Sequence, residues 1–98
     1  MDFEYKKLIV EFIGTFFFIS IILNSMNDNR IGLHGIALSL LAVIYFGSNI
    51  SGGHFNPAVT CTMILDNKIV FNLGMLYIIS QLIGGYAAYK FNNIVLKN

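Results

Sequence analysis

Three long apolar runs separated by short polar breaks dominate the pattern of this sequence. The runs cover residues 8–26, 31–50 and 69–89. Each is about 20 residues long, which is the length that a helix needs to cross the hydrocarbon core of a bilayer. The first break, Asn27–Arg30, is a short polar turn. The pattern predicts three transmembrane helices in an integral, multi-pass membrane protein.

The segment between the second and third runs, residues 51–65, does not fit a simple three-span count. It opens with glycines, which disfavour a helix, and continues with Asn56 and Pro57, a favoured N-cap and a favoured first helical residue. We therefore expect a helix from Pro57 to about Leu65. Such a helix would be roughly 13 Å long, less than half of a ~30 Å hydrocarbon core. The segment is predicted to enter the membrane and return on the same side as a re-entrant loop and half-helix.

The predicted depth of this loop in the membrane restricts where its backbone can lie. Irregular backbone at membrane depth is tolerated only where it is buried in protein or lines a water-filled path. The carbonyl groups of Gly52, Gly53 and His54 are the expected lining of such a path, because glycine allows the dihedral angles that turn successive carbonyls toward it. Asn56 would lie at the positive end of a short helix, where cations are repelled and a neutral polar solute meets hydrogen-bond donors. For the His54 side chain, structural packing is favoured over gating.

Composition supports lipid as the solvent of a single domain, residues 1–98. Hydrophobic residues make up 56% of the chain and charged residues 11%, whereas soluble domains carry about 25% charged residues. A net charge of +1 without a basic run argues against a nucleic-acid partner. We find neither a nucleophile paired with a base nor metal-ligand spacing, so we predict no enzyme, cofactor or metal site. Cys61 is expected to be a small packed side chain. A cleaved signal peptide is a poor fit, because the first run is too long and contains Glu11.

Residues 51–60, Ser-Gly-Gly-His-Phe-Asn-Pro-Ala-Val-Thr, resemble the first signature loop of the aquaporin and aquaglyceroporin family. Residues 11–15 resemble the first helix of that family, which carries a buried glutamate, and residues 77–85 resemble its third helix. The resemblance covers nearly the whole chain but only the first half of a usual member, which has two inverted repeats. It implies an all-α membrane fold with three transmembrane helices and one re-entrant half-helix, half of the aquaporin fold.

The resemblance also implies residue roles. Asn56 would donate to the passing solute, while Pro57 and Ala58 would pack against the half-helix of a second repeat. The family's water channels narrow at a filter that includes an arginine directly after the second Asn-Pro-Ala. Here Val59 follows the motif. Ile36 aligns with the filter residue that the family carries in its second transmembrane helix. A filter of Ile36, Val59 and Gly53 would be apolar and would lack the fixed positive charge that hinders cations and protons. We expect a less discriminating pore for passive flux of water, with glycerol and ammonia as candidate solutes.

Other residues are expected to support the loop. By resemblance, Glu11 would accept hydrogen bonds from the loop backbone, Ser51 would open the loop, and Gln81 would support it on its other side. A carboxylate inside a spanning helix is costly and is a functional candidate on physical grounds as well. The alternative is a glutamate that reaches the interface, because Glu11 lies only three positions after Leu8.

A single half-helix leaves its apex unpaired, so the predicted partner is an inverted second copy or a separate second half. Inverted repeats have opposite orientations, so a homodimer needs one copy in each, and it could assemble further in fours as the family does. The difference in lysine and arginine content between the two sides of the membrane sets the orientation of a membrane protein. Here the two sides are balanced, with Lys6, Lys7 and Lys68 on one side and Arg30, Lys90 and Lys97 on the other. Three alternatives stay open: a non-conducting partner of other aquaporin-type chains, a degenerate fragment and a small lytic pore former.

Overall fold

The computed structural model describes residues 3–25 and 32–96 of the chain, and these residues form a helical bundle. The elements are α1 (Phe3–Ser25), α2 (Gly32–Ser51), α3 (Pro57–Leu65), α4 (Phe71–Phe91) and the π-helical turn η1 (Asn92–Leu96). Within these described residues, three segments are long and apolar enough to cross a membrane, namely Glu4–Ser25, Gly32–Ser51 and Phe71–Leu96. The predicted class, an all-α membrane protein with three spans and one short helix, is confirmed.

Several helix ends differ from the ends of the apolar runs. α1 begins at Phe3 instead of residue 8, because lysine and glutamate are good helix formers and a helix continues beyond the hydrocarbon. α2 includes Ser51, which the sequence pattern places in the re-entrant segment, and the Gly52 N–H still donates to the Ser48 carbonyl at 3.0 Å. α4 begins at Phe71, two residues after the third apolar run begins. The predicted turn at residues 27–30 lies outside the described residues.

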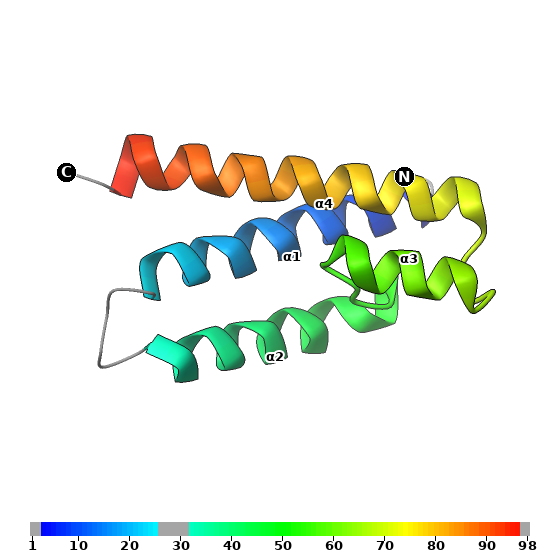
Figure 1. Ribbon diagram of the computed structural model, residues 1–98, viewed down its shortest axis with the longest axis horizontal. Coiled ribbons are helices and arrows are strands. Elements are labelled where there is room, and N and C mark those ends of the chain that lie inside the picture. The colour runs from blue at the N-terminus through cyan, green and yellow to red at the C-terminus, as the bar shows by residue number, and fades with distance from the viewer. Residues whose placement is uncertain (1–2, 26–31, 97–98) are drawn as a thin grey trace.

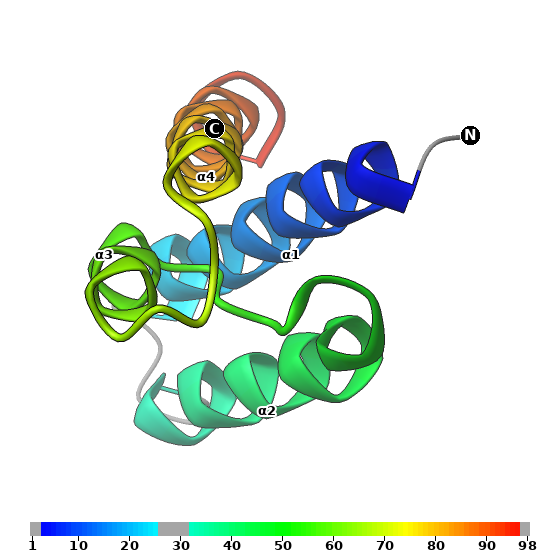
Figure 2. The same ribbon diagram turned by 90° about the vertical axis from the view of Figure 1, so that its right-hand side faces the viewer.

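α1 is the central helix of the bundle (Figure 1, Figure 2). It packs against both α2 and α4, whereas α3 packs against α4. Among the described residues, α2 makes no close backbone approach to α3 or α4. α3 accompanies only one end of the bundle, the end where α2 finishes and α4 starts (Figure 1). The connection between α2 and α3 therefore depends on the loop of residues 52–56 and on the side chains that hold it.

Small residues set the closest helix approach, as the sequence suggests for the third span. A Cβ on Gly84 of α4 would lie 2.6 Å from the Phe12 carbonyl oxygen of α1, and one on Gly74 would lie 2.5 Å from the Ile64 side chain of α3. Either position would force a packed neighbour to move. Glycine at these two sites lets α4 lie directly against α1 and α3.

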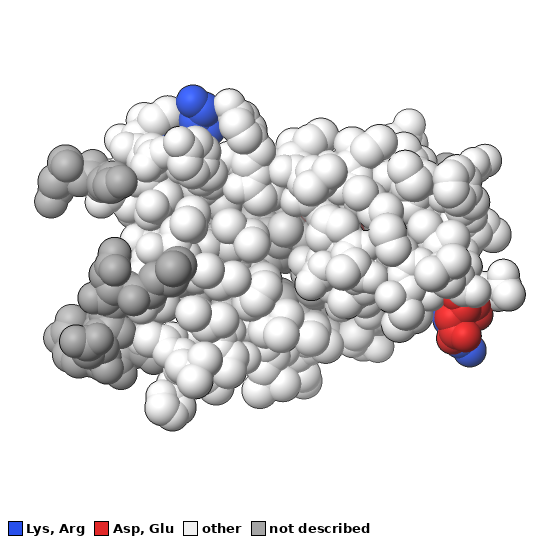
Figure 3. Space-filling view, viewed as in Figure 1, with Lys and Arg blue, Asp and Glu red and all other residues white. Residues whose placement is uncertain are grey.

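Polarity is inverted relative to a soluble domain. Large hydrophobic side chains are exposed along α1, α2 and α4 and at the end of α3, while Glu11, Thr60 and Gln81 are almost completely buried. On the face shown in Figure 3, charged side chains appear near the two ends and the surface between them is nearly uncharged. This distribution fits a bilayer, with hydrocarbon around the middle of the bundle and water at its ends.

Candidate functional site

The carboxylate of Glu11 on α1 is the centre of the site. It is fully buried, with 0% of its surface exposed. Its Oε2 accepts hydrogen bonds from the Ser51 hydroxyl at 2.7 Å and the His54 N–H at 3.0 Å. Its Oε1 accepts from the Phe55 N–H and from Gln81 Nε2, each at 2.8 Å. One side chain thus joins α1, α2, the loop and α4, and the alternative of a glutamate at the membrane interface is wrong.

A second layer of hydrogen bonds extends from this carboxylate to α3 and α4. Gln81 Nε2 also donates to Thr60 Oγ1 at 2.9 Å, and the same oxygen lies 2.8 Å from Nδ1 of His54. The Tyr77 hydroxyl donates to the Ser51 carbonyl at 2.7 Å, and its ring lies against the His54 ring at a centroid distance of 5.1 Å. The His54 imidazole is therefore held by a contact with the Tyr77 ring and by the Thr60 hydroxyl.

The backbone of the loop turns its N–H groups to one side. The Gly53 N–H donates to the hydroxyl of the serine that ends α2 at 3.1 Å, and the next two N–H groups, of His54 and Phe55, donate to Glu11. The described residues contain no cis peptide bond, and in a trans peptide the carbonyl points opposite to the N–H of the following residue. The carbonyls of Gly53 and His54 consequently point away from the carboxylate, and the carbonyl of Gly52 points away from the Ser51 hydroxyl.

α3 begins directly after this loop. Asn56 is its N-cap, with Oδ1 accepting from the Ala58 N–H at 2.8 Å, and Pro57 occupies the first helical position. The cap satisfies one N–H that the helix itself cannot bond. Because Oδ1 is used in the cap and Asn56 is exposed, its side-chain NH₂ is the part that remains to act as a donor.

Phe55 anchors the loop on its apolar side. Only 3% of its surface is exposed, and its ring fills the space left by Gly14 of α1 and Gly47 of α2. A Cβ on Gly47 would lie 2.7 Å from the ring, and one on Gly14 would overlap it. Phe55 adopts φ of 52°, which is uncommon for a residue other than glycine. Burial of the ring and the hydrogen bond to Glu11 offset this cost.

The remaining expected residues are not all brought together within one chain. Val59 and Ala58 lie in the first turn of α3, close to the loop. Ile36 lies near the start of α2, 15 residues before the end of that helix at Ser51, which is about 22 Å along its axis. Within a single chain, Ile36 therefore cannot line the same constriction as Gly53.

One expectation about a side chain needs correction. Cys61 is exposed instead of packed, because α4 covers only one side of α3. Gln81, which was expected to support the loop, donates to Glu11 and Thr60 and so contacts the residues that hold the loop.

Sequence reasoning missed several residues that build the site. Thr60 and Tyr77 hold side chains in the network, and Phe55 with its two glycines fixes the loop. One available signal was the polar character of Thr60 and Tyr77 within otherwise apolar helices, since buried polar groups need partners. The pairing of Phe55 with Gly14 and Gly47 carried no comparable signal, because it joins three separate segments.

Comparison with known proteins places this site in a family. The whole chain, residues 1–98, matches the family described as Major intrinsic protein. The chain belongs to the major intrinsic protein family. It is 39% identical over 92 residues to "Aquaporin NIP1-1" of Arabidopsis thaliana, a match that covers 85% of this chain and 31% of the relative.

Other members of the major intrinsic protein family match in the same way. "Aquaporin PIP1-2" of Zea mays is 38% identical over 92 residues, covering 82% of this chain and 32% of the relative. "Glycerol uptake facilitator protein-like 6" of Lactiplantibacillus plantarum is 37% identical over 89 residues, covering 85% and 40%. No solved structure shows a significant match. The chain thus spans about a third of the length of the curated relatives it matches.

Proposed function

We propose that this chain supplies one half of an aquaporin-type pore for passive flux of water and small neutral solutes, and that an inverted second copy or a partner half completes it. The observation that carries the proposal is the orientation of the loop between α2 and α3. Its N–H groups are bound to Glu11 and Ser51, which leaves three successive carbonyls free to replace water around a passing solute. The donor side of the path is the exposed amide of Asn56.

The position of Ile36 supports an inverted partner. It lies about 22 Å along α2 from the end where the loop begins. Gly53 and Val59 of a second chain in the opposite orientation would reach the Ile36 end of the first. The apex of α3 supports the same pairing, because Asn56 and Ala58 are exposed in the single chain. The predicted lack of orientation bias rests on six lysine and arginine residues. Two of them, Arg30 and Lys97, lie outside the described residues.

The solute class follows from the expected filter. Ile36, Val59 and Gly53 carry no charge, so a constriction made from them would exclude solutes by size and by the cost of removing their water. One relative is called a glycerol uptake facilitator protein-like protein and others are called aquaporins. Water is therefore the first solute to test, followed by glycerol and ammonia.

Stopped-flow swelling of proteoliposomes tests conduction. We expect water permeability above that of protein-free liposomes, and a clear reduction in Asn56→Ala, which loses both the N-cap and the donor. Asn72→Ala is the matched control, because Asn72 is exposed in the first turn of α4. Flux equal to that of protein-free liposomes with correctly inserted protein would reject the channel and favour the non-conducting alternative.

The orientation of the chain in lipid tests the pairing. A single cysteine placed at either terminus in a Cys61→Ser background can be labelled with a membrane-impermeant reagent. We expect about half of the molecules to be labelled at each terminus, because an antiparallel pair contains both orientations. Labelling of one terminus only would reject the homodimer and point to a partner half.

A further inference from the structure

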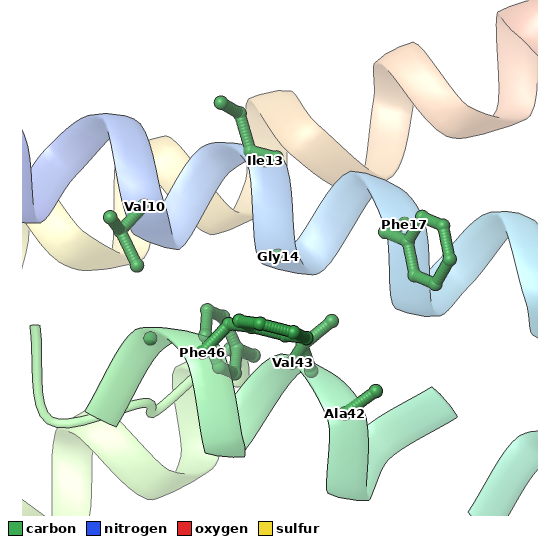
Figure 4. Close-up of a pocket in the computed structure, with 9 residues that line it drawn as sticks. Val10, Ile13, Gly14, Phe17, Ala42, Val43 and Phe46 are labelled. Carbon is green, nitrogen blue, oxygen red and sulfur yellow. The ribbon is translucent and has the colours of Figure 1, made fainter. Parts of the chain in front are cut away.

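The loop between α2 and α3 contributes residues to two cavities of different chemistry. The first lies between α1 and α2 and has only apolar lining residues, which Figure 4 shows. The second, here called the polar cavity, has a volume of about 460 Å³, and its lining includes Lys7, Gly52, His54, Lys68 and Tyr77. In the part of the chain that the structure describes, no carboxylate lines it. What a solute meets there depends on which nitrogen of the His54 ring carries the proton.

The hydroxyl of Thr60 lies between two nitrogen atoms. It is fully buried, and its oxygen is 2.9 Å from Gln81 Nε2 and 2.8 Å from His54 Nδ1. The Gln81 NH₂ group is the donor in its contact, because it also donates to Glu11 Oε1, an oxygen that accepts from the Phe55 N–H as well. The opposite placement of the amide would put its oxygen against a carboxylate oxygen. Thr60 Oγ1 therefore accepts from Gln81, and its own hydrogen needs another acceptor.

The hydrogen of the Thr60 hydroxyl has His54 Nδ1 as its acceptor. In the described residues this hydroxyl makes no bond to the backbone, in contrast to the Thr62 hydroxyl, which donates to the Ala58 carbonyl at 3.0 Å. If Nδ1 carried the proton, the Thr60 hydrogen would be buried without an acceptor, which is costly. A neutral imidazole has one N–H group and one bare nitrogen, so the proton of His54 belongs on Nε2.

The Nε2 side of the His54 ring faces the polar cavity. A Cβ on Gly52 would lie 3.6 Å from Nε2, and both residues line the cavity. Nε2 is not one of the buried side-chain atoms that lack a hydrogen-bond partner among the described residues, and none of the hydrogen bonds of His54 uses it. Its proton is therefore available to a molecule in the cavity.

We propose that Thr60 is a positioning residue that holds His54 as the neutral tautomer with its proton on Nε2, so that the ring presents a hydrogen-bond donor to the polar cavity. This donor binds the oxygen of a neutral solute such as water, beside loop carbonyls that only accept. The other tautomer would present a lone pair, which attracts protons and cations instead. The identity of the solute rests on the proposed function, whereas the tautomer can be measured in protein that does not conduct.

Nitrogen NMR of protein labelled in its histidine rings tests the tautomer. The chain has two histidines, and His34→Gln removes the exposed one. At about pH 8, a histidine with the ordinary pKa of about 6.5 is neutral. A neutral ring gives one protonated and one bare nitrogen signal, and coupling to both ring carbon protons identifies Nε2. We expect the proton on Nε2, and a substantial share of rings protonated at Nδ1 would overturn the proposal.

Variants of the hydroxyl test the role of Thr60. Thr60→Val removes the hydroxyl, and the ratio of Nε2-protonated to Nδ1-protonated rings should fall by about tenfold, since no buried hydroxyl hydrogen is then left without an acceptor in the Nδ1 form. Thr60→Ser keeps the hydroxyl and should keep the ratio. Thr62→Val, which alters an exposed threonine of the same helix, is the matched control. An unchanged ratio in Thr60→Val would overturn the role of Thr60, and Thr60→Ala gives the same comparison if Thr60→Val does not fold.

Stopped-flow swelling of proteoliposomes tests the donor. His54→Leu removes it, and water flux should fall by about fivefold, the equivalent of one hydrogen bond to the solute. His54→Gln keeps an NH₂ group in the side chain and should retain more flux. Equal flux in the two variants would show that the ring does not donate to the solute. Absence of flux in the unsubstituted protein would reject the proposed function and leave the tautomer measurement standing.

Discussion

The two sides of the loop between α2 and α3 are held by opposite kinds of interaction. On one side the carboxylate of Glu11 accepts four hydrogen bonds, two of them from loop N–H groups. On the other side the Phe55 ring fills a space that exists only because Gly14 and Gly47 have no side chains. Hydrogen bonds are directional and fix which way the peptide groups face, whereas the ring fixes how deep the loop lies.

This difference predicts different consequences of damage. Removing the carboxylate leaves buried donors without an acceptor, and each unpaired donor lowers the free energy of unfolding. Blocking the space around the ring forces the ring to move, and the cost depends on how far its neighbours can adjust. The polar side should therefore be the more sensitive one, and variants on each side can separate orientation of the loop from its depth.

The largest effect is expected for Glu11→Ala. It leaves the His54 and Phe55 N–H groups unpaired inside the protein, which should lower the free energy of unfolding by about 2–6 kcal/mol at 1–3 kcal/mol for each group. Water flux should fall to the level of protein-free liposomes, because the loop carbonyls lose their orientation. Unfolding in detergent and stopped-flow swelling measure the two effects.

Two further variants control this experiment. Glu11→Gln keeps one acceptor oxygen but places an NH₂ group against donors, so its stability should lie between those of Glu11→Ala and the unsubstituted protein. Glu4→Ala changes an exposed glutamate in the same helix and should alter the free energy of unfolding by less than about 1 kcal/mol. Unchanged stability in Glu11→Ala would mean that Phe55 alone holds the loop.

The second effect in size is expected for Gly14→Ala on the apolar side. The new methyl group would overlap the Phe55 ring, and overpacking of this kind costs about 1–3 kcal/mol. The matched control is Gly85→Ala, where the nearest atom lies at 4.0 Å and stability should be unchanged or slightly higher. Unfolding of both variants in the same detergent gives the comparison.

A double variant sharpens the assignment to Phe55. Phe55→Leu reduces the ring to a smaller side chain, so Gly14→Ala should be less harmful in that background than alone. The two substitutions would then be coupled by at least about 0.5 kcal/mol, as for residues in contact. Additive effects would show that Gly14 matters for another reason.

Local chemistry explains how much of the fold the sequence could predict. The half-helix begins at Pro57 and ends at Leu65, in agreement with the predicted ends, because the Asn-Pro pair and Asp66 act within one turn of their own positions. The start of α1 was predicted five residues too late. The apolar run marks the part of the helix inside the hydrocarbon core, and the helix continues beyond that core. Local signals were sufficient for the spans and insufficient for their exact limits.

Long-range contacts explain what the sequence left out of the site. Glu11 could be singled out because an intramembrane carboxylate is unusual by itself. Its partner Ser51 follows it by 40 positions and Gln81 by 70, and neither the distances nor the roles of Thr60 and Tyr77 follow from local pattern. The exposure of Cys61 was missed for a related reason: an apolar neighbourhood in sequence does not reveal which face of α3 another helix covers.

The smallest effect is expected for Tyr77→Phe, on the polar side but one step from Glu11. The substitution removes the hydrogen bond from the Tyr77 hydroxyl to the Ser51 carbonyl while keeping the ring against His54. The loss should be about 1 kcal/mol, with water flux reduced but not abolished, because both Glu11 bonds to the loop remain. Tyr86→Phe, which alters a tyrosine that is 61% exposed on the same helix, should leave both quantities unchanged. If Tyr77→Phe matched Glu11→Ala in either measurement, the end of α2 would control the loop as strongly as the carboxylate does, and the separation of orientation from depth would fail.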